Sequence, residues 1–357
     1  MTRPVKSKGS DSRDTARPKI QDVAKAAKVS IGTVSAVLNG NGRVADATRQ
    51  HVQRTMERLG YQPDLYASNL PRRQSRLLGI VVSNLQNPFF AETAQAIEEE
   101  AALSGYQISL IATRFSPERQ RIAVRELLRA RTTGIAVLTS EYDSETYEEV
   151  LASQVPTVFL DNGKPAKTIT RVRVDAQSGI RLAVEHLIDL GHRDLLFLRN
   201  SQQTSGASLL SHSLRERGFL AAVRKHRLRG LRTRVCDLKS PGTQPSQEAF
   251  EGALNSMDFT AIVASTDVVA MMACHFLQTR GLQIPRDVSV IGFDNIEFSQ
   301  YLNPPLSTVD IPRIELARAV VSALTGKTDQ NDILIKTQII LRQSTAKPGE
   351  RNSVLRS

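Results

Sequence analysis

Residues 20–39 read IQDVAKAAKVSIGTVSAVLN and predict two short helices separated by a polar turn. Apolar residues recur at helical spacing in both halves: Ile20, Val23, Ala24, Ala27, Val34, Val37 and Leu38. Ser30 is placed to cap the second helix. Small and polar residues make the outer face of that helix: Gly32, Thr33, Ser35 and Asn39. This pattern is typical of a helix-turn-helix whose second helix enters the major groove of DNA, although similar helix pairs also occur as plain packing units.

The positive charge of the chain is concentrated around this motif. Residues 1–75 carry 14 Lys and Arg and 6 Asp and Glu, so they supply +8 of the net charge of +11. DNA binding requires such charge because Lys and Arg neutralise phosphates. A merely solvated basic surface would account for the charge but not for its coincidence with the motif. The sequence therefore favours a DNA-binding headpiece, which we assign to residues 18–62.

Length and composition bound the class of protein. A chain of 357 residues, 40% hydrophobic and 23% charged, is expected to form two or three globular domains. Residues 1–17 form a basic tail that we expect to be disordered. The sequence has neither a signal-peptide core nor a run of roughly 20 apolar residues that could span a membrane, so a cytoplasmic protein is predicted. Cys236, Cys274 and the six histidines lack the spacing of disulfides or metal sites, so we expect buried thiols and no metal or cofactor.

Two further segments complete the N-terminal region. A third helix is predicted over about 45–59, and Gly60 ends it. Three apolar residues on one side of this helix can close a small core over the first two helices: Val52, Met56 and Leu59. Residues 63–75 are predicted to be a linker that contains a short helix between Pro63 and Pro71.

From residue 77 onward, apolar strand patterns alternate with amphipathic helix patterns. The first strands read LLGIVVS, QISLIA, GIAVLTS and VPTVFLD, and a second series reads DLLFLRN, TAIVAS and DVSVIGFD. Such alternation predicts an α/β fold with doubly wound parallel sheets. Two similar halves predict two lobes with a ligand cleft at the carboxyl ends of their strands. The predicted bounds are 76–174 with 308–330 for the first lobe, 175–307 with 331–345 for the second, and 346–357 for a tail.

Several motifs in a fixed order carry a resemblance to a known family. They are DVAKAAKVS with GTVSAVLN near the start, GYQP at 60–63, NPFF at 87–90, EHLIDLGHR at 185–193, RERGF at 215–219, IPRDVSVIGFDN at 284–295 and PPLSTV at 304–309. Over about residues 19–345 the chain resembles the lactose-repressor family of bacterial transcription regulators. The resemblance implies an all-α helix-turn-helix headpiece, a short hinge helix and a two-lobed α/β core like that of a periplasmic sugar-binding protein.

The resemblance also implies which residues contact DNA. They are Ile31, Gly32 and Ala36 as base readers, Thr33, Ser35 and Asn39 toward phosphates, Ser30 and Arg43 beside them, and Ala67 and Leu70 in a hinge helix over 65–70 that enters the minor groove. The reading positions lack the long polar side chains of other members, so discrimination must rely on apolar contact, backbone approach and DNA shape. Lys28 stands where the family commonly has Gly, which costs on the order of 1 kcal/mol if that residue is left-handed. Read without the family, residues 65–70 are an ordinary linker with one exposed leucine.

An effector site in the cleft follows from the same resemblance. It would comprise Phe89 and Phe90 as an apolar wall, Asp161 and Asp294 as hydroxyl acceptors, Arg215 as a forked donor, and Ser211 and Thr266 as weaker polar contacts. Carboxylates and a guanidinium suit a polyhydroxyl ligand because they accept from and donate to its oxygens. We therefore expect a sugar, a sugar acid or a similarly polar metabolite. The alternative is that Asp161, Arg215 and Asp294 form structural ion pairs at the lobe interface.

The predicted function is a ligand-responsive transcription repressor that binds a near-palindromic, double-stranded DNA operator as a homodimer. The tail AKPGERNSVLRS lacks the leucine heptads that the family uses for tetramers, which favours a dimer. One alternative is a solute-binding protein of a transport system, which the basic headpiece opposes. Another is an α/β enzyme that uses Asp161, His212 and Asp294. No G-x-S-x-G nucleophile elbow is present, so no catalysis is expected.

Overall fold

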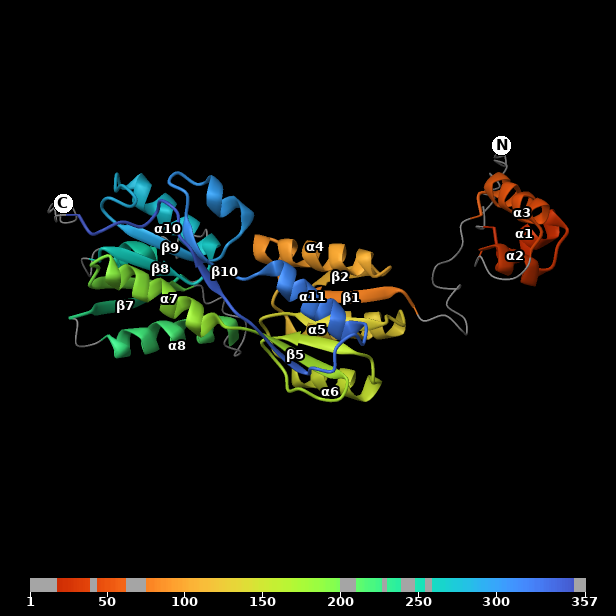
Figure 1. Ribbon diagram of the computed structural model, residues 1–357, viewed down its shortest axis with the longest axis horizontal. Helices are drawn as coiled ribbons and strands as arrows, with labels where there is room; N and C mark the ends of the chain where they lie inside the picture. Colours follow the sequence, from red (N-terminus) through yellow and green to blue (C-terminus); the bar gives the residue numbers. More distant parts are fainter. Residues whose placement is uncertain are drawn as a thin grey trace, which may run out of the picture. The chain divides into compact units, whose positions relative to one another are not determined.

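The computed structural model describes residues 18–38, 44–61, 75–199, 210–226, 230–238, 248–253 and 259–349, with the side chains of 210–212 excepted (Figure 1). The chain separates into two compact units, Met1–Gln74 and Ser75–Ser357. We call the first unit the headpiece and the second unit the core, and we describe each by itself.

The described part of the headpiece contains three helices: α1 (Ile20–Ala27), α2 (Ile31–Leu38) and α3 (Asp46–Leu59). Their apolar faces meet in one cluster of buried side chains: Val23, Ala24, Ala27, Val34, Val37 and Val52. Gly60 ends α3 in the left-handed conformation with φ 62°, as the sequence predicts. Lys28 follows α1 with φ 53° and ψ 40°, so this turn carries the strain of a left-handed residue other than glycine.

The first lobe of the core is built on a parallel sheet. Its described strands lie in the order β11 (Asp332–Ile335), β5 (Ile169–Val174), β4 (Thr157–Leu160), β3 (Gly134–Leu138), β1 (Leu77–Val82) and β2 (Gln107–Ala112). Side chains alternate between the two faces: Leu78 and Ile80 pack in one hydrophobic cluster, and Val81 packs in another. Helices α4 (Pro88–Leu103) and α11 (Arg313–Leu324) pack together on the first face, and α5 (Pro117–Arg129) and α6 (Ser144–Ser153) cover the second (Figure 1).

The second lobe repeats this plan. Its described strands lie in the order β12 (Gln338–Ile340), β10 (Ser307–Asp310), β9 (Ser289–Asp294), β8 (Ala261–Ala264), β6 (Asp194–Arg199) and β7 (Arg232–Asp237). Neighbouring strands are parallel except for β12, which runs antiparallel to β10. Helices α7 (Ala176–Asp189) and α8 (Leu210–Lys225) pack together on one face, and α10 (Asp267–Thr279) packs on the other. A short 3-10 helix, η3 (Glu297–Tyr301), follows β9.

The fold class predicted from the sequence is confirmed, and two of the predicted lobe bounds are misplaced by a few residues. Residues 308–330 are predicted in the first lobe, yet β10 pairs with β9 of the second. Residues 331–345 are predicted in the second lobe, yet β11 pairs with β5 of the first. The chain crosses between the lobes three times, after β5, after β10 and after β11, which is the number of crossings in the predicted bounds. The misplaced bounds fall at β10 and β11, which are only four residues long and carry too little pattern to indicate which sheet they join.

Candidate functional site

The first turn of α2 is the exposed end of the headpiece motif. The backbone N–H of Thr33 donates to Oγ of Ser30 at 3.0 Å, which is the predicted helix cap. The two hydroxyl groups lie 2.9 Å apart. Ile31 comes directly after the cap and is 48% exposed, whereas Val34, one turn later, is fully buried. The capped turn therefore presents an apolar side chain on the outer face, where the sequence predicts DNA contacts.

Gly32 leaves the backbone of this turn open. A Cβ atom at Gly32 would meet only Oγ of Ser30, at 3.6 Å, which is an ordinary contact. The fold does not need glycine here, although glycine inside a helix costs roughly 0.5–1 kcal/mol relative to alanine. Thr33, Ser35 and Ala36 are each partly exposed on the same helix. Gly32 therefore leaves the backbone open on the exposed side of this turn.

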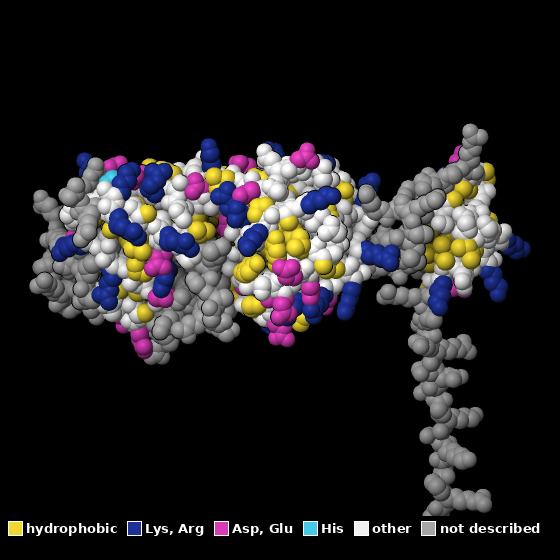
Figure 2. Space-filling model, turned by 90° about the horizontal axis from the view of Figure 1, so that it is seen from below, with side chains coloured by type: hydrophobic (Ala, Val, Ile, Leu, Met, Phe, Trp, Pro, Cys, Tyr) yellow, Lys and Arg dark blue, Asp and Glu magenta, His cyan; other side chains and the backbone are white. Residues whose placement is uncertain are grey.

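Four predicted DNA contacts lie outside the described residues: Asn39, Arg43, Ala67 and Leu70. The hinge helix predicted over 65–70 also lies outside them. In the described headpiece, Lys and Arg side chains stand out around the surface seen in Figure 2. These side chains lie on α1 and α3 or at the ends of α1, and none lies on α2: they are Lys19, Lys25, Lys28, Arg49, Arg54 and Arg58.

A cavity of about 230 Å³ lies between the two lobes of the core. Most of its walls come from the carboxyl ends of strands: Leu138 to Ser140 after β3, Leu160 to Asn162 after β4, and Val174, Thr266 and Asp294 at the ends of β5, β8 and β9. The predicted effector residues that line it are Phe89, Phe90, Asp161, Arg215, Thr266 and Asp294. The side chain of Ser211 lies outside the described residues. Residues from distant parts of the sequence thus converge at the place where open parallel sheets bind ligands.

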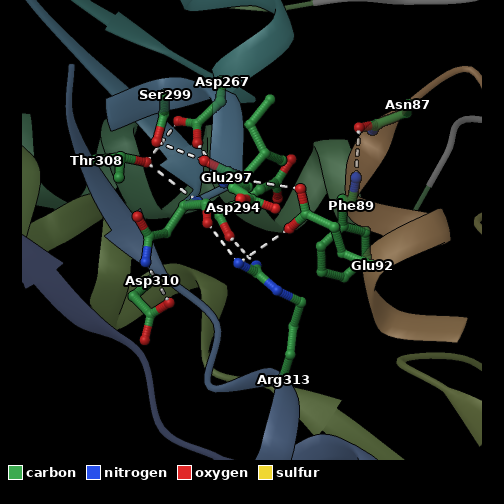
Figure 3. Close-up of polar contacts among 12 residues, drawn as sticks. Asn87, Phe89, Glu92, Asp267, Asp294, Glu297, Ser299, Thr308, Asp310 and Arg313 are labelled. Atoms are coloured by element: carbon green, nitrogen blue, oxygen red, sulfur yellow. Dashed lines mark hydrogen bonds and ion pairs between the residues drawn. The ribbon is translucent and has the colours of Figure 1, made fainter. Parts of the chain in front are cut away.

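The apolar wall of the cavity is the first turn of α4. Asn87 caps this helix, because its Oδ1 accepts from the backbone N–H of Phe89 at 3.2 Å, and Pro88 supplies the preset φ of the first helical residue (Figure 3). The rings of Phe89 and Phe90 pack edge to face with centroids 5.4 Å apart. The NPFF motif therefore fixes two aromatic side chains at the cavity, which suits contact with the apolar face of a ring-shaped ligand.

Asp161 supplies an acceptor from the first lobe. It follows β4 in the left-handed conformation, with φ 59°, and its Oδ1 accepts from the backbone N–H of Val174 at 2.7 Å. Burial raises the pKa of Asp161 to about 6, although the Val174 hydrogen bond and the charge of Arg215 both act to lower it. The carboxyl group is held in place by one oxygen and can meet a ligand with the other.

Arg215 and Asp294 form the polar wall of the second lobe. The Nη2 of Arg215 donates to Asp294 at 2.9 Å, its Nη1 donates to the Ser265 carbonyl at 2.6 Å, and the guanidinium stacks 4.1 Å from the ring centroid of Phe293. Both residues belong to the second lobe and line the cavity between the lobes, so the structural alternative is right that Arg215 and Asp294 form an ion pair there. Nε of Arg215 is buried without a hydrogen-bond partner among the described residues. An unsatisfied buried donor costs roughly 1–3 kcal/mol, which a ligand oxygen would recover.

Asp294 is the more deeply buried acceptor, with 1% of its surface exposed. Burial raises its pKa to about 6, against the lowering effect of the charges on Arg215 and Arg313. The ionisable groups that line the cavity are therefore two carboxyls and one guanidinium. This set favours a neutral polyhydroxyl ligand over an anionic one, because hydroxyl groups donate to carboxylates and a second anion would be repelled.

Amide and hydroxyl groups that were not predicted from the sequence line the first-lobe side of the cavity: Asn84, Gln86, Thr139, Ser140 and Asn162. Behind them, the buried carboxylate of Glu141 accepts from the Ser83 hydroxyl at 2.7 Å and from the Thr113 hydroxyl. Nearly all of these residues follow β1, β2, β3 or β4 within a few positions. Their place just after apolar strands was the signal that could have identified them.

Other kinds of site find no support in the described part of the chain. No group of three or more His, Cys, Asp or Glu is arranged there to hold a metal ion. No helix among these residues combines the length and apolar character needed to cross a membrane. Cys236 and Cys274 are buried free thiols, as the sequence predicts.

Comparison with known proteins adds independent findings. Residues 19–64 match the family model for bacterial regulatory proteins of the lacI family, and residues 184–345 match the periplasmic binding protein-like domain. The chain is 31% identical to the transcriptional regulator DegA of Bacillus subtilis over 335 residues, covering 92% of this chain and 98% of DegA. It is 32% identical to the HTH-type transcriptional repressor PurR of Actinobacillus pleuropneumoniae over 339 residues, covering 91% of this chain and 97% of PurR.

Two solved structures show the same architecture. The lac repressor dimer bound to operator and an anti-inducer superposes with a TM-score of 0.75 and 26% identity, covering 92% of this chain and 99% of that one. A complex of the regulator CelR with cellobiose superposes with a TM-score of 0.61 and 26% identity, covering 92% and 100%. Both similarities extend over the headpiece and core together.

Proposed function

Because the chain belongs to the lacI family of bacterial regulatory proteins, we propose that it is a repressor of transcription whose DNA binding is controlled by a small polar ligand. The observation that carries the proposal is the presence, in one chain, of a capped helix-turn-helix and of a cavity lined by Arg215, Asp161 and Asp294. A solute-binding protein for transport would use the cavity but not the headpiece. A regulator uses both.

The headpiece would read DNA through the first turn of α2. We propose that Ile31 contacts a thymine methyl group and that Gly32 lets the backbone approach the base edges, with Thr33 and Ser35 toward phosphates. Leu70, with Ala67 beside it, would enter the minor groove at a flexible central step. The lac repressor structure contains a dimer on its operator, and a dimer of this chain would read two half-sites of a near-palindrome in the same way.

Three large apolar side chains of the core are exposed, and we propose that a second copy of the chain covers them. Phe298 and Tyr301 of η3 are 58% and 70% exposed, and Ile314 of α11 is 65% exposed. Ile314 lines a groove together with residues of α4 and with Glu297 and Gln300 of η3, the short helix that also carries Phe298 and Tyr301. We propose that this surface contributes to the homodimer, since large exposed apolar patches commonly mark interfaces.

The ligand is proposed to be a sugar or sugar acid, and the charges of the cavity favour a neutral sugar. CelR was solved with cellobiose, and another structural relative with 25% identity was solved with D-xylulofuranose. Ligand binding would change the closure of the lobes and thereby the affinity of the protein for its operator. This coupling must be reciprocal, so operator DNA would change ligand affinity by the same factor.

The proposal is tested by a thermal-shift screen of the purified protein against matched pairs of neutral sugars and sugar acids. A ligand at 100 times its Kd stabilises a protein by about 2.7 kcal/mol, which such a screen resolves. Duplexes selected from a random library then give the operator, and the hit from the screen must change its affinity. A protein that selects no duplex, or whose operator affinity no bound sugar changes, is not the regulator proposed here.

Gly32→Ala gives a sharper test of the headpiece. We expect operator affinity to fall by about tenfold or more, because a methyl group would stand between the α2 backbone and the base edges, a loss of the size of one base contact. Thermal stability should stay equal or rise slightly, since Cβ has space and alanine favours the helix. Gly60→Ala is the matched control: its φ of 62° makes alanine strained, so stability should fall. Unchanged operator affinity in Gly32→Ala would remove α2 from the interface.

A further inference from the structure

The segment that carries Asp294 has an unusual backbone. Asp294 has φ 114° and Asn295 has φ 52°, so two consecutive residues other than glycine lie in the left-handed half of the backbone map. Such residues cost on the order of 1–3 kcal/mol each and persist only where surrounding contacts impose them. The contacts that hold this pair come from both lobes of the core.

Arg313 holds this segment from the first lobe. It is the first residue of α11, which packs against α4. Its Nη1 donates to the carbonyl of Asp294 at 2.7 Å, and its Nη2 donates to the carbonyl of Asn295 at 2.5 Å (Figure 3). One guanidinium therefore satisfies both carbonyls of the strained pair and fixes the direction in which the Asp294 side chain leaves the backbone.

Glu92 completes the connection. It lies on α4, and its Oε2 is 3.0 Å from Nη2 of Arg313. Its Oε1 accepts from the backbone N–H of Glu297 at 2.9 Å, which is the first residue of η3 in the second lobe. Figure 3 shows the carboxylate of Glu92 between the guanidinium of Arg313 and the backbone at Glu297. The two side chains are only 20% and 18% exposed, so solvent screens the pair weakly.

On its other side, the same segment is fixed to the second lobe. The Asn295 side chain donates to Asp310 at 2.9 Å and accepts from Arg342 at 2.7 Å. The N–H of Ile296 donates to Asp267 at 2.9 Å. Residues 294–297 must therefore move with the second lobe as a unit. Any change in lobe closure has to break or rearrange the hydrogen bonds from Glu92 and Arg313.

We propose that Glu92 and Arg313 form an inter-lobe clamp that sets the closure equilibrium of the core and positions Asp294 at the cavity. Glu92 lies on the same helix as Phe89 and Phe90, within one turn, so the clamp links the apolar wall of the first lobe to the acidic acceptor of the second. Both are positioning residues, because neither lines the cavity. The consequence for ligand response rests on the proposed function, whereas the clamp itself is a property of the core alone.

The test measures lobe closure without ligand or DNA. Spin labels are attached to the full-length protein through Glu126→Cys on α5 and His275→Cys on α10, both exposed positions, and labelled protein is diluted with unlabelled protein to remove distances between copies. The native thiols are buried, and burial raises the pKa of Cys274 to about 12, so they react poorly with the label. Electron–electron double resonance then gives the distribution of inter-lobe distances.

In Glu92→Ala and Arg313→Ala we expect this distribution to shift and broaden. Amide exchange at Glu297 should accelerate at least tenfold in Glu92→Ala, because this N–H loses its acceptor. Arg313→Lys should restore part of the effect, since an ammonium can reach Glu92 but cannot serve both carbonyls. If an alanine variant does not fold, Glu92→Gln replaces it in the same measurements. This variant keeps an acceptor for the Glu297 amide but loses the charge that pairs with Arg313.

Glu100→Ala and Arg318→Ala are the matched controls. This pair joins the same two helices, α4 and α11, at 3.8 Å, but stays within the first lobe. Neither control should change the distances or the exchange. Distances and exchange that match the parent in both clamp variants would overturn the clamp, as would equal changes in the controls. A failed ligand screen or failed DNA selection would count against the proposed function without altering this result.

Discussion

Deletion of residues 1–74 is expected to abolish binding to operator DNA while the remaining core still binds its ligand. The headpiece and core are separate compact units, and the headpiece holds the capped α2 helix and most of the net positive charge of the chain. Loss of specific affinity should reach the full 10³-fold or more by which specific binding typically exceeds non-specific binding, at least about 4 kcal/mol. Fluorescence anisotropy with labelled operator measures the first effect, and the ligand-induced thermal shift measures the second.

The salt dependence of the parent protein provides the control for this deletion. If several phosphates are neutralised per dimer, the logarithm of affinity should fall linearly with the logarithm of salt concentration, with a slope of roughly −0.9 per phosphate. The isolated core should show neither operator binding nor this dependence. A core that still bound the operator with a steep salt slope would place the DNA interface outside the headpiece.

Arg215→Ala should lower ligand affinity by on the order of 2–4 kcal/mol, because a buried charged donor is lost and Asp294 loses its partner. Operator binding in the absence of ligand should persist, so the variant should repress without responding. Isothermal titration calorimetry with the sugar found in the screen measures the change. Arg217→Ala is the matched control, because Arg217 lies on the same helix and is exposed. Equal affinities in parent and Arg215→Ala would place the ligand elsewhere.

The same variant should change the pH dependence of ligand binding. A ligand hydroxyl donates to ionised Asp161 and Asp294, so affinity should be full above their pKa values of about 6 and should fall as the pH drops through them. Arg215 acts to lower both pKa values, so its removal should move the midpoint to higher pH. A midpoint that stays in place would show that these carboxyls do not control binding.

The sequence predicted those parts of the fold that have strong local patterns. The helix faces of the headpiece and the uninterrupted apolar strands such as β1, β3 and β8 lie where the periodicity predicted them. β5 and β7 were missed, because ITRVRV and RTRVCD alternate apolar residues with arginine and lack the apolar run of a strand buried on both faces. β11 and β12 are only four and three residues long, so they carry almost no pattern.

The candidate site also has one part that the sequence predicted and one part that it did not. Asp161, Arg215 and Asp294 were predicted because they stand in recognisable sequence motifs, and all three line one cavity. The strained backbone of Asp294 and its dependence on Arg313, nineteen positions later, depend on how α11 packs against α4. No residue pattern near either position indicates that contact. Sequence motifs therefore identified the side chains that can bind a ligand. The side chains that hold those groups in place were found only in the structure.

The three crossings between the lobes have a consequence for how the protein is made. The sheet of the first lobe needs β11, which ends at residue 335, and the sheet of the second needs β12, which ends at residue 340. Domains usually fold during synthesis in the order in which they leave the ribosome. Here neither sheet is complete until its last strand, β11 or β12, has left the ribosome. Until then, β5 in the first lobe and β10 in the second each keep an unpaired edge. Such unpaired strand edges favour aggregation of the nascent chain. The crossings also mean that exchanging one lobe alone between relatives requires three chain junctions, after β5, after β10 and after β11.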